Sequence, residues 1–316
     1  PGGIRTDLKY EGTAEPVTNE DGVVTFEEAA VVQPFANTLV TMDLTGAQVL
    51  EVLEQQWQPE TASRPFLKLG VAGLTYQYDP TAPAGERITK VMLDSGEEFD
   101  EAATYRIVVN SFLASGGDNF TAFTGGANVA DSGRIDLDVF VAYIGEFGTE
   151  ESPLMPDYGQ RAIGVVDVNG NGEAIESGQE IAIDLSSLLF STNEPKAENV
   201  VVTFDGQVLG TFPIDPSIVD ETDEVGRAQV RVTIPNLDGY DKGELVTLAV
   251  HLDSADGDTV LEWTYEMEGS DDDGGGVTPP MPDTGADVAD LGLIAGALLL
   301  MGVGGLYTRR RMMALQ

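Results

Sequence analysis

The pattern of apolar and polar positions changes character near residue 161 of this 316-residue chain. Before that point, helical and strand-like patterns alternate. Thr25 and Glu28 form a capping box that predicts a short helix, and Thr45 precedes a second helical pattern over residues 47–57. The apolar residues of that second pattern, Val49, Leu50, Leu53 and Trp57, share one face. Strands are predicted at 38–44, 74–78, 88–93 and 105–109, and a further helix within 137–147. Together these elements predict an α+β (mixed α/β) domain over residues 1–161.

Residues 166–268 show short strand patterns and almost no helical periodicity. The strand-like runs are 180–185, 200–204, 228–234, 245–252 and 259–265. Turn pairs such as Asp205-Gly206 separate them, which is typical of strands joined by tight turns. The pattern predicts an all-β, immunoglobulin-like sandwich domain, whose simplest role is that of a spacer.

The C-terminal end has the pattern of a membrane anchor. Residues 269–280 are acidic and rich in Gly and Pro, which is typical of a linker that packs no core. Residues 288–307 are almost wholly apolar, and Arg309, Arg310 and Arg311 follow. Because a long apolar run followed by basic residues is the pattern of a stop-transfer segment, we expect a C-terminal transmembrane helix over residues 288–307.

Between the linker and the apolar run lies the motif MPDTG, formed by Met281, Pro282, Asp283, Thr284 and Gly285. Together with the apolar segment and the basic tail, all within residues 281–316, it resembles the LPxTG cell-wall sorting signal of Gram-positive bacteria, with Met where Leu is usual. The resemblance implies that a sortase cleaves after Thr284, joins Thr284 to peptidoglycan and discards the helix, which is in the membrane only transiently. A plain membrane anchor is the alternative. Both place the bulk of the protein outside the cytoplasm.

Charge and composition argue against some partners. The formal net charge is −38 and there is no cysteine. Because nucleic-acid binding usually needs a basic surface, we expect no direct nucleic-acid binding. The lack of cysteine fits an exported protein that is stable without disulfides. The chain begins with Pro1 rather than Met, so we expect it to be cut from within a longer protein, and no signal peptide is visible.

Residues 110–120, NSFLASGGDNF, carry the strongest candidate chemistry. The preceding run, 105–109, predicts a buried strand that ends in this loop, and Gly116-Gly117 permits a positive φ and a close approach of backbone to a ligand. Phe112 offers an aromatic face, and Asp118 offers a carboxylate that only accepts hydrogen bonds. Such a loop suits a ligand with both a π-face and hydroxyl groups, for example a nucleoside.

Together with residues 2–5 (GGIR) and 33–37 (QPFAN), this loop resembles the C-terminal, substrate-binding domain of the 5′-nucleotidase family, which includes UDP-sugar hydrolases and 2′,3′-cyclic phosphodiesterases. The resemblance covers residues 1–161. It implies that Arg5 contacts the phosphate and ribose region and that Asp118 accepts hydrogen bonds from the ribose hydroxyls. It implies further that the rings of Phe35 and Phe112 stack on the two faces of the base. It also implies, for Asn37, a hydrogen bond to the base edge and, for Gly3, backbone close to the ligand.

The same resemblance implies that the reaction itself takes place elsewhere. In that family a separate N-terminal domain hydrolyses the substrate with two metal ions held by Asp, His and Asn ligands. This chain has a single histidine, His251, which we expect to be a structural or surface residue. We therefore expect the nucleotide-binding portion of a cell-surface 5′-nucleotidase-like phosphohydrolase, with no catalytic residue, metal ligand or cofactor of its own; the two divalent metal ions belong to the missing domain. The alternatives are the C-terminal part of a surface nuclease or 2′,3′-cyclic phosphodiesterase, or a non-catalytic nucleotide-binding or adhesive wall protein.

Two smaller features complete the picture. Residues 167–172 (DVNGNG) match the start of a calcium-binding loop, but Gly178 occupies the twelfth position, where a bidentate Glu is needed. We therefore expect a turn at Asp167 to Asn171 rather than a calcium site. Phe120 and Phe123 are expected to lie in the core.

Overall fold

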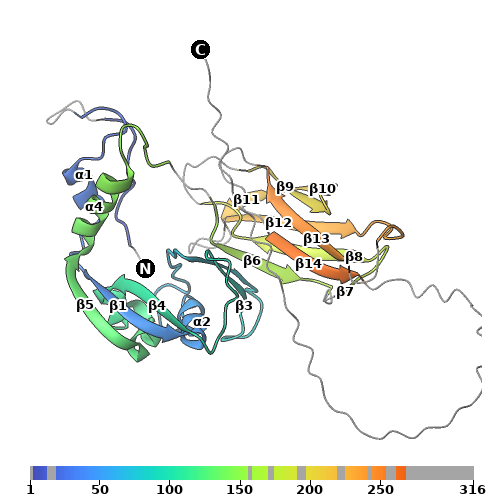
Figure 1. Ribbon diagram of the computed structural model, residues 1–316, viewed down its shortest axis with the longest axis horizontal. Coiled ribbons are helices and arrows are strands. Elements are labelled where there is room, and N and C mark those ends of the chain that lie inside the picture. Colours follow the sequence, from blue (N-terminus) through green and yellow to red (C-terminus); the bar gives the residue numbers. More distant parts are fainter. Residues whose placement is uncertain are drawn as a thin grey trace, which may run out of the picture. The chain divides into compact units, whose positions relative to one another are not determined.

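The computed structural model describes residues 3–12, 19–155, 159–169, 174–190, 197–218, 225–240, 244–253 and 261–267 (Figure 1). All of them belong to one compact unit, Pro1–Glu268. The expected linker at 269–280, the motif at 281–285 and the membrane segment at 288–307 lie outside the described residues. Among the helices in the described ranges, none combines the length and the apolar character needed to cross a membrane. The described part is a mixed α/β structure with several sheets and few helices.

A small antiparallel sheet forms the centre of the first part of the chain. Its strands are ordered β4-β1-β5, where β1 is Thr38–Thr45, β4 is Thr104–Asn110 and β5 is Ala127–Ile135. In β1, Val40, Met42 and Leu44 are buried, while the residues between them are not, because successive side chains of a strand point to opposite faces. The buried face packs in a core that includes Phe120 and Phe123, 0% and 4% exposed, as predicted.

Short helices pack beside this sheet. They are α1 (Phe26–Val32), α2 (Gly46–Glu54), α3 (Ser111–Ala114) and α4 (Asp136–Phe147), with 3-10 turns at Gly117–Asn119 and Thr121–Gly125. Helices α2 and α3 contact β1, α4 contacts β5, and α1 contacts α4. The predicted capping box at Thr25 and Glu28 is confirmed, and Thr45 forms a second one with Gln48 that was not predicted. Helix α2 ends at Glu54, three residues before its predicted end at Trp57. At this end the buried side-chain amide of Gln56 donates to the carbonyl oxygen of Leu53 at 2.8 Å, which supplies one of the partners that a helix end needs.

The prediction that residues 105–109 form a buried strand is wrong in one respect. The strand exists as β4, but its residues alternate between exposed and half-buried, and Val108 is 59% exposed. The reason is that the core covers one face of this antiparallel sheet: Tyr105, Ile107 and Val109 pack against it, while Arg106 and Val108 point to the open face.

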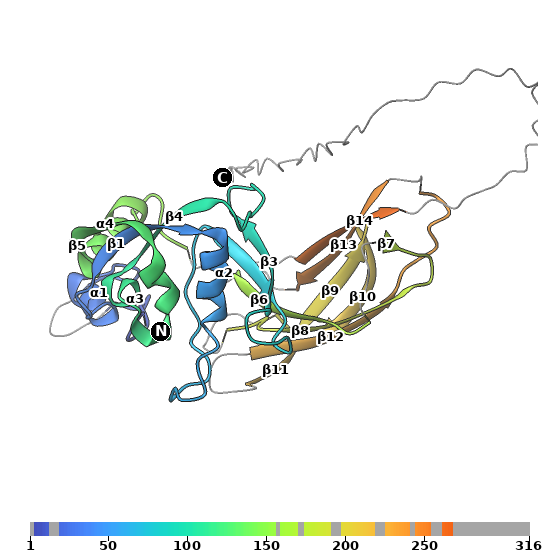
Figure 2. The ribbon, with the colours of Figure 1, turned by 90° about the horizontal axis from the view of Figure 1, so that it is seen from below.

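The second part of the chain forms two sheets that enclose one hydrophobic core, and two strands from the first part, β2 and β3, complete one of them (Figures 1 and 2). The five-stranded sheet has the order β10-β9-β13-β14-β7, and the six-stranded sheet has the order β11-β12-β8-β6-β2-β3. The strands of the first sheet are Gln207–Pro213, Asn199–Phe204, Leu245–Leu252, Leu261–Met267 and Ala174–Ile175. Those of the second are Asp215–Ile218, Val225–Thr233, Glu180–Ser186, Ala162–Asp167, Leu74–Tyr78 and Ile88–Leu93.

The six-stranded sheet joins the two parts. Strand β2 pairs in parallel with β6, so the hairpin β2–β3 from the first part extends a sheet of the second. The hydroxyl groups of Tyr78 and Ser187, both buried, are hydrogen-bonded at 2.7 Å across this junction. A parallel pair of strands needs a long connection, here about 85 residues long, and pairing at such a distance leaves no local pattern in the sequence.

Candidate functional site

A pocket of about 920 Å³ lies where β1 begins and β4 ends, beside the N-terminal segment. All six residues predicted to contact a ligand line it: Gly3, Arg5, Phe35, Asn37, Phe112 and Asp118. The rest of the wall is formed by Ile4, Gln33, Leu39, Arg64, Leu69, Gly70, Val108, Val109, Asn110, Leu113 and Asp136. Three segments that are far apart in the sequence therefore meet at one site.

The position of Phe112 is fixed by its neighbours in the loop. The side chain of Asn110 caps α3 by accepting a hydrogen bond from the backbone N–H of Leu113 at 2.8 Å. Gly117 packs directly against the ring, because a Cβ at this position would lie 2.6 Å from two ring carbons. The Phe112 ring is nevertheless 45% exposed, unlike the buried rings of Phe120 and Phe123. A large aromatic ring held at the surface of a pocket is available for stacking.

Arg5 and Phe35 form a pair. The guanidinium carbon of Arg5 lies 4.9 Å from the centroid of the Phe35 ring, a cation–π geometry. The backbone N–H of Arg5 donates to the carbonyl oxygen of Val32 at 3.0 Å, which ties the N-terminal segment to the end of α1. The sequence resemblance assigned separate contacts to these two side chains and gave no sign that they touch.

Asp118 presents its carboxylate from an unusual backbone conformation. Its φ is +52°, and Asn119, which follows, has a φ of +65°; non-glycine residues rarely adopt this left-handed region. Within the part of the chain that the structure describes, the Asp118 carboxylate has no hydrogen bond or ion pair, and the side chain is half-buried in the pocket wall. An unpaired carboxylate in a pocket is suited to accept hydrogen bonds from hydroxyl groups.

Asn37 is held by a residue that the sequence did not single out. The backbone N–H of Asn37 donates to the carboxylate of Asp136 at 3.2 Å, and the backbone N–H of Asp136 donates back to the carbonyl oxygen of Asn37 at 2.8 Å. Asp136 begins α4, where a carboxylate is favoured by the unpaired N–H groups of the first turn. That preference was a possible signal, whereas nothing in the local sequence marks Arg64 as part of the wall.

Two other candidates lie away from the pocket. His251 is on β13, where a ring nitrogen is 3.3 Å from the Thr203 hydroxyl. In the suggested calcium loop, the Asp167 carboxylate accepts a hydrogen bond from the backbone N–H of Asn169 at 3.3 Å, and residues 170–173 lie outside the described residues. Across the described ranges, no group of three or more His, Cys, Asp or Glu residues is arranged to hold a metal ion.

Comparison with known proteins links the pocket to one family. Residues 1–125 match the family described as 5′-nucleotidase, C-terminal domain. The chain is 34% identical over 140 residues to the trifunctional nucleotide phosphoesterase protein YfkN of Bacillus subtilis (strain 168). The aligned region covers 42% of this chain and 9% of that protein. It is also 33% identical over 145 residues to the cell wall protein Lmo0130 of Listeria monocytogenes serovar 1/2a, and that aligned region covers 45% of this chain and 17% of the Listeria protein.

Among solved structures, the 5′-nucleotidase precursor from Thermus thermophilus matches with 36% identity and a TM-score of 0.39, over 51% of this chain and 29% of that one. The resemblance predicted over residues 1–161 is thus confirmed for residues 1–125. The matched region spans between 9% and 29% of the length of these three proteins.

Proposed function

We propose that residues 1–125, which match the C-terminal domain of the 5′-nucleotidase family, bind the nucleotide substrate of a phosphohydrolase that acts on nucleotides and releases nucleoside and phosphate. The observation that carries this proposal is the pocket in which Arg5, Phe35, Phe112 and Asp118 meet. Two aromatic rings, one guanidinium and one unpaired carboxylate match the base, the phosphate and the ribose of a nucleotide, respectively.

The charges around the pocket support a small anionic ligand. The protein as a whole carries a formal net charge of −38, which repels anions at long range. Two arginine side chains, Arg5 and Arg64, nevertheless line the pocket, together with Asp118 and Asp136. The guanidinium groups supply the local positive charge that a phosphate needs, since they bind phosphate oxygens with good geometry. Hydrolysis itself would belong to a two-metal site in another part of the protein.

Titration with adenosine and AMP tests this proposal. We expect the ring signals of Phe35 and Phe112 to shift on addition of either ligand, in NMR spectra of the full chain with labelled aromatic residues, because both rings would stack on the base. The ring of Tyr143, 52% exposed on α4 and absent from the pocket lining, serves as the internal control. Unchanged Phe35 and Phe112 signals at millimolar ligand would contradict nucleotide binding by this pocket.

We also propose that the protein is anchored to the cell wall through the motif at residues 281–285. The support is the order of motif, apolar run and basic tail in the sequence, together with the relative from Listeria monocytogenes whose name is cell wall protein.

The substitution Thr284→Ala is expected to remove protein from the covalent peptidoglycan fraction, because sortase transfers the threonine carbonyl. Thr278→Ala, in the linker, is the matched control and should stay anchored. Covalent retention of the Thr284→Ala protein would rule out sortase attachment at this residue.

A further inference from the structure

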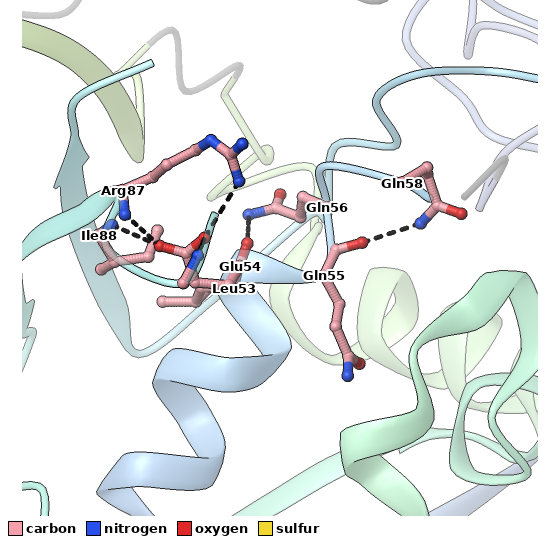
Figure 3. A network of polar contacts seen from close by, with 8 residues as sticks. Leu53, Glu54, Gln55, Gln56, Gln58, Arg87 and Ile88 are labelled. Carbon is pink, nitrogen blue, oxygen red and sulfur yellow. Dashed lines mark hydrogen bonds and ion pairs between the residues drawn. The ribbon is translucent and has the colours of Figure 1, made fainter. Parts of the chain in front are cut away.

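Two of the three glutamines that follow α2 bond to segments that line the pocket, and the third bonds to a segment outside it. Gln55, Gln56 and Gln58 lie on one short stretch of chain, and their side chains point to different segments (Figure 3). Gln56, fully buried, accepts a hydrogen bond from the backbone N–H of Leu69, at 2.8 Å, in the pocket wall. Gln55 accepts one from the backbone N–H of Ala122 at 3.0 Å. Gln58 is the one that reaches the loop carrying Asp118.

Gln58 makes two contacts to that loop. Its side-chain N–H donates to the backbone carbonyl oxygen of Asp118 at 3.0 Å, and its side-chain oxygen accepts a hydrogen bond from the Asn119 amide at 2.7 Å. The same amide nitrogen of Gln58 also donates to the carbonyl oxygen of Gln55 at 2.8 Å, which orients the side chain from behind (Figure 3). The backbone N–H of Gln58 donates to the carbonyl oxygen of Pro65 at 2.8 Å, so the residue is fixed at both ends.

These contacts act on the part of the loop that most needs support. Asp118 and Asn119 are consecutive non-glycine residues with φ of +52° and +65°. Asp and Asn adopt this left-handed conformation more readily than other residues with a Cβ, but it still costs free energy, and contacts from the surroundings offset that cost. Gln58 contacts both strained residues and no ligand-facing atom of either: it holds the backbone of Asp118 and leaves its carboxylate unpaired.

We propose that Gln58 is a positioning residue for Asp118, and that it thereby sets the preference of the pocket for ligands that carry ribose hydroxyls. This inference rests on the proposed function, in which Asp118 accepts hydrogen bonds from those hydroxyls. Gln58 acts through the loop: without it, residues 118 and 119 relax toward ordinary backbone conformations, and the carboxylate moves away from the sugar while the two stacking rings stay in place.

The test compares two ligands with the same base. Adenosine has both the 2′ and the 3′ hydroxyl of ribose, and 2′,3′-dideoxyadenosine has neither. The dissociation constant of dideoxyadenosine divided by that of adenosine therefore reports the contact with Asp118, and a large ratio means that the hydroxyls contribute to binding. In the full chain, Gln58→Ala is expected to weaken adenosine binding about tenfold and to leave dideoxyadenosine binding unchanged, since a charge-assisted hydrogen bond is lost and stacking is not. Gln55→Ala is the matched control: it removes a neighbouring glutamine that contacts residues 121 and 122, and the ratio should stay as in the unmodified protein.

A second variant covers the case in which Gln58→Ala fails to fold. Asn119→Ala removes the side-chain amide that bonds to Gln58 and places at this position a residue that tolerates a positive φ less well than Asn, so it should lower the ratio in the same direction. The inference is overturned, and the proposed function stands, if the ratio is large in the unmodified protein and unchanged in Gln58→Ala, or unchanged in Asn119→Ala where Gln58→Ala does not fold. Equal binding of both ligands by the unmodified protein overturns the role of Asp118 and with it this inference, and no binding of either overturns the proposed function as well.

Discussion

Replacing Phe112 with alanine is expected to weaken adenosine binding roughly 30- to 150-fold. The ring would lose both the apolar area it buries against the base and the stacking contact, together worth about 2–3 kcal/mol. The free protein should be affected much less, because Phe112 is 45% exposed and lies outside the set of buried residues that form the core of this part. The measurement is the dissociation constant for adenosine, by calorimetry or NMR titration, alongside the thermal unfolding temperature.

Two further variants separate stacking from general damage. Phe112→Tyr keeps an aromatic face and should bind adenosine within a few-fold of the unmodified protein. Tyr143→Ala removes an aromatic ring of similar exposure on α4, outside the pocket lining, and should have no effect on binding. If Phe112→Ala binds adenosine as well as the Tyr143→Ala protein does, the ring does not stack on the base and the proposed arrangement of the ligand is wrong.

The sequence predicted correctly those strands whose apolar pattern and flanking turns lie within the strand segment itself. The strands at Leu74–Tyr78, Ile88–Leu93 and Leu245–Leu252 have the predicted bounds, since apolar and β-branched runs and their flanking turns are visible in the sequence itself. Strand β5 was missed because Ala127–Ile135 contains Asn, Asp, Ser and Gly, which favour turns. It is a strand because it pairs with β1, and all nine of its residues are exposed, so no buried face imposes an alternating pattern.

In the candidate site, too, the residues in local motifs were predicted and those that act through distant contacts were not. The six predicted ligand-facing residues lie in short motifs beside turns, and all of them line the pocket. Asp136 and Gln58 were missed because their roles depend on contacts across 99 and 60 residues, respectively. The immunoglobulin-like connectivity of residues 166–268 stays a prediction; the structure shows that β2 and β3 extend one of its sheets, a pairing across many residues that no local pattern encodes.

The second large effect is expected at Glu54, the last residue of α2. Its carboxylate accepts hydrogen bonds from the backbone N–H groups of Gly85 at 3.0 Å, Ile88 at 2.9 Å and Arg87, and it pairs with the Arg87 guanidinium at 3.4 Å (Figure 3). The Glu54 side chain is 11% exposed, so this is a nearly buried anion whose partners come from the turn before β3. The Arg87 guanidinium also lies over the ring of Trp57, 5.1 Å from its centroid, and so connects the carboxylate to the segment that carries the pocket glutamines.

Glu54→Ala is therefore expected to lower the free energy of unfolding by about 3 kcal/mol, since it leaves backbone donors and a guanidinium without their acceptor. For a unit of this size, that loss corresponds to a fall in Tm of roughly 6–12 °C, measured by calorimetry or circular dichroism. Glu51→Ala, one turn earlier on the same helix, is the matched control, because Glu51 is exposed and accepts a single side-chain hydrogen bond, from Gln55 at 3.3 Å. Glu54→Gln, which keeps one acceptor oxygen, should fall between the two. Equal stability of the Glu54→Ala and Glu51→Ala proteins would show that water replaces the carboxylate at no cost and that the turn before β3 is held by other contacts.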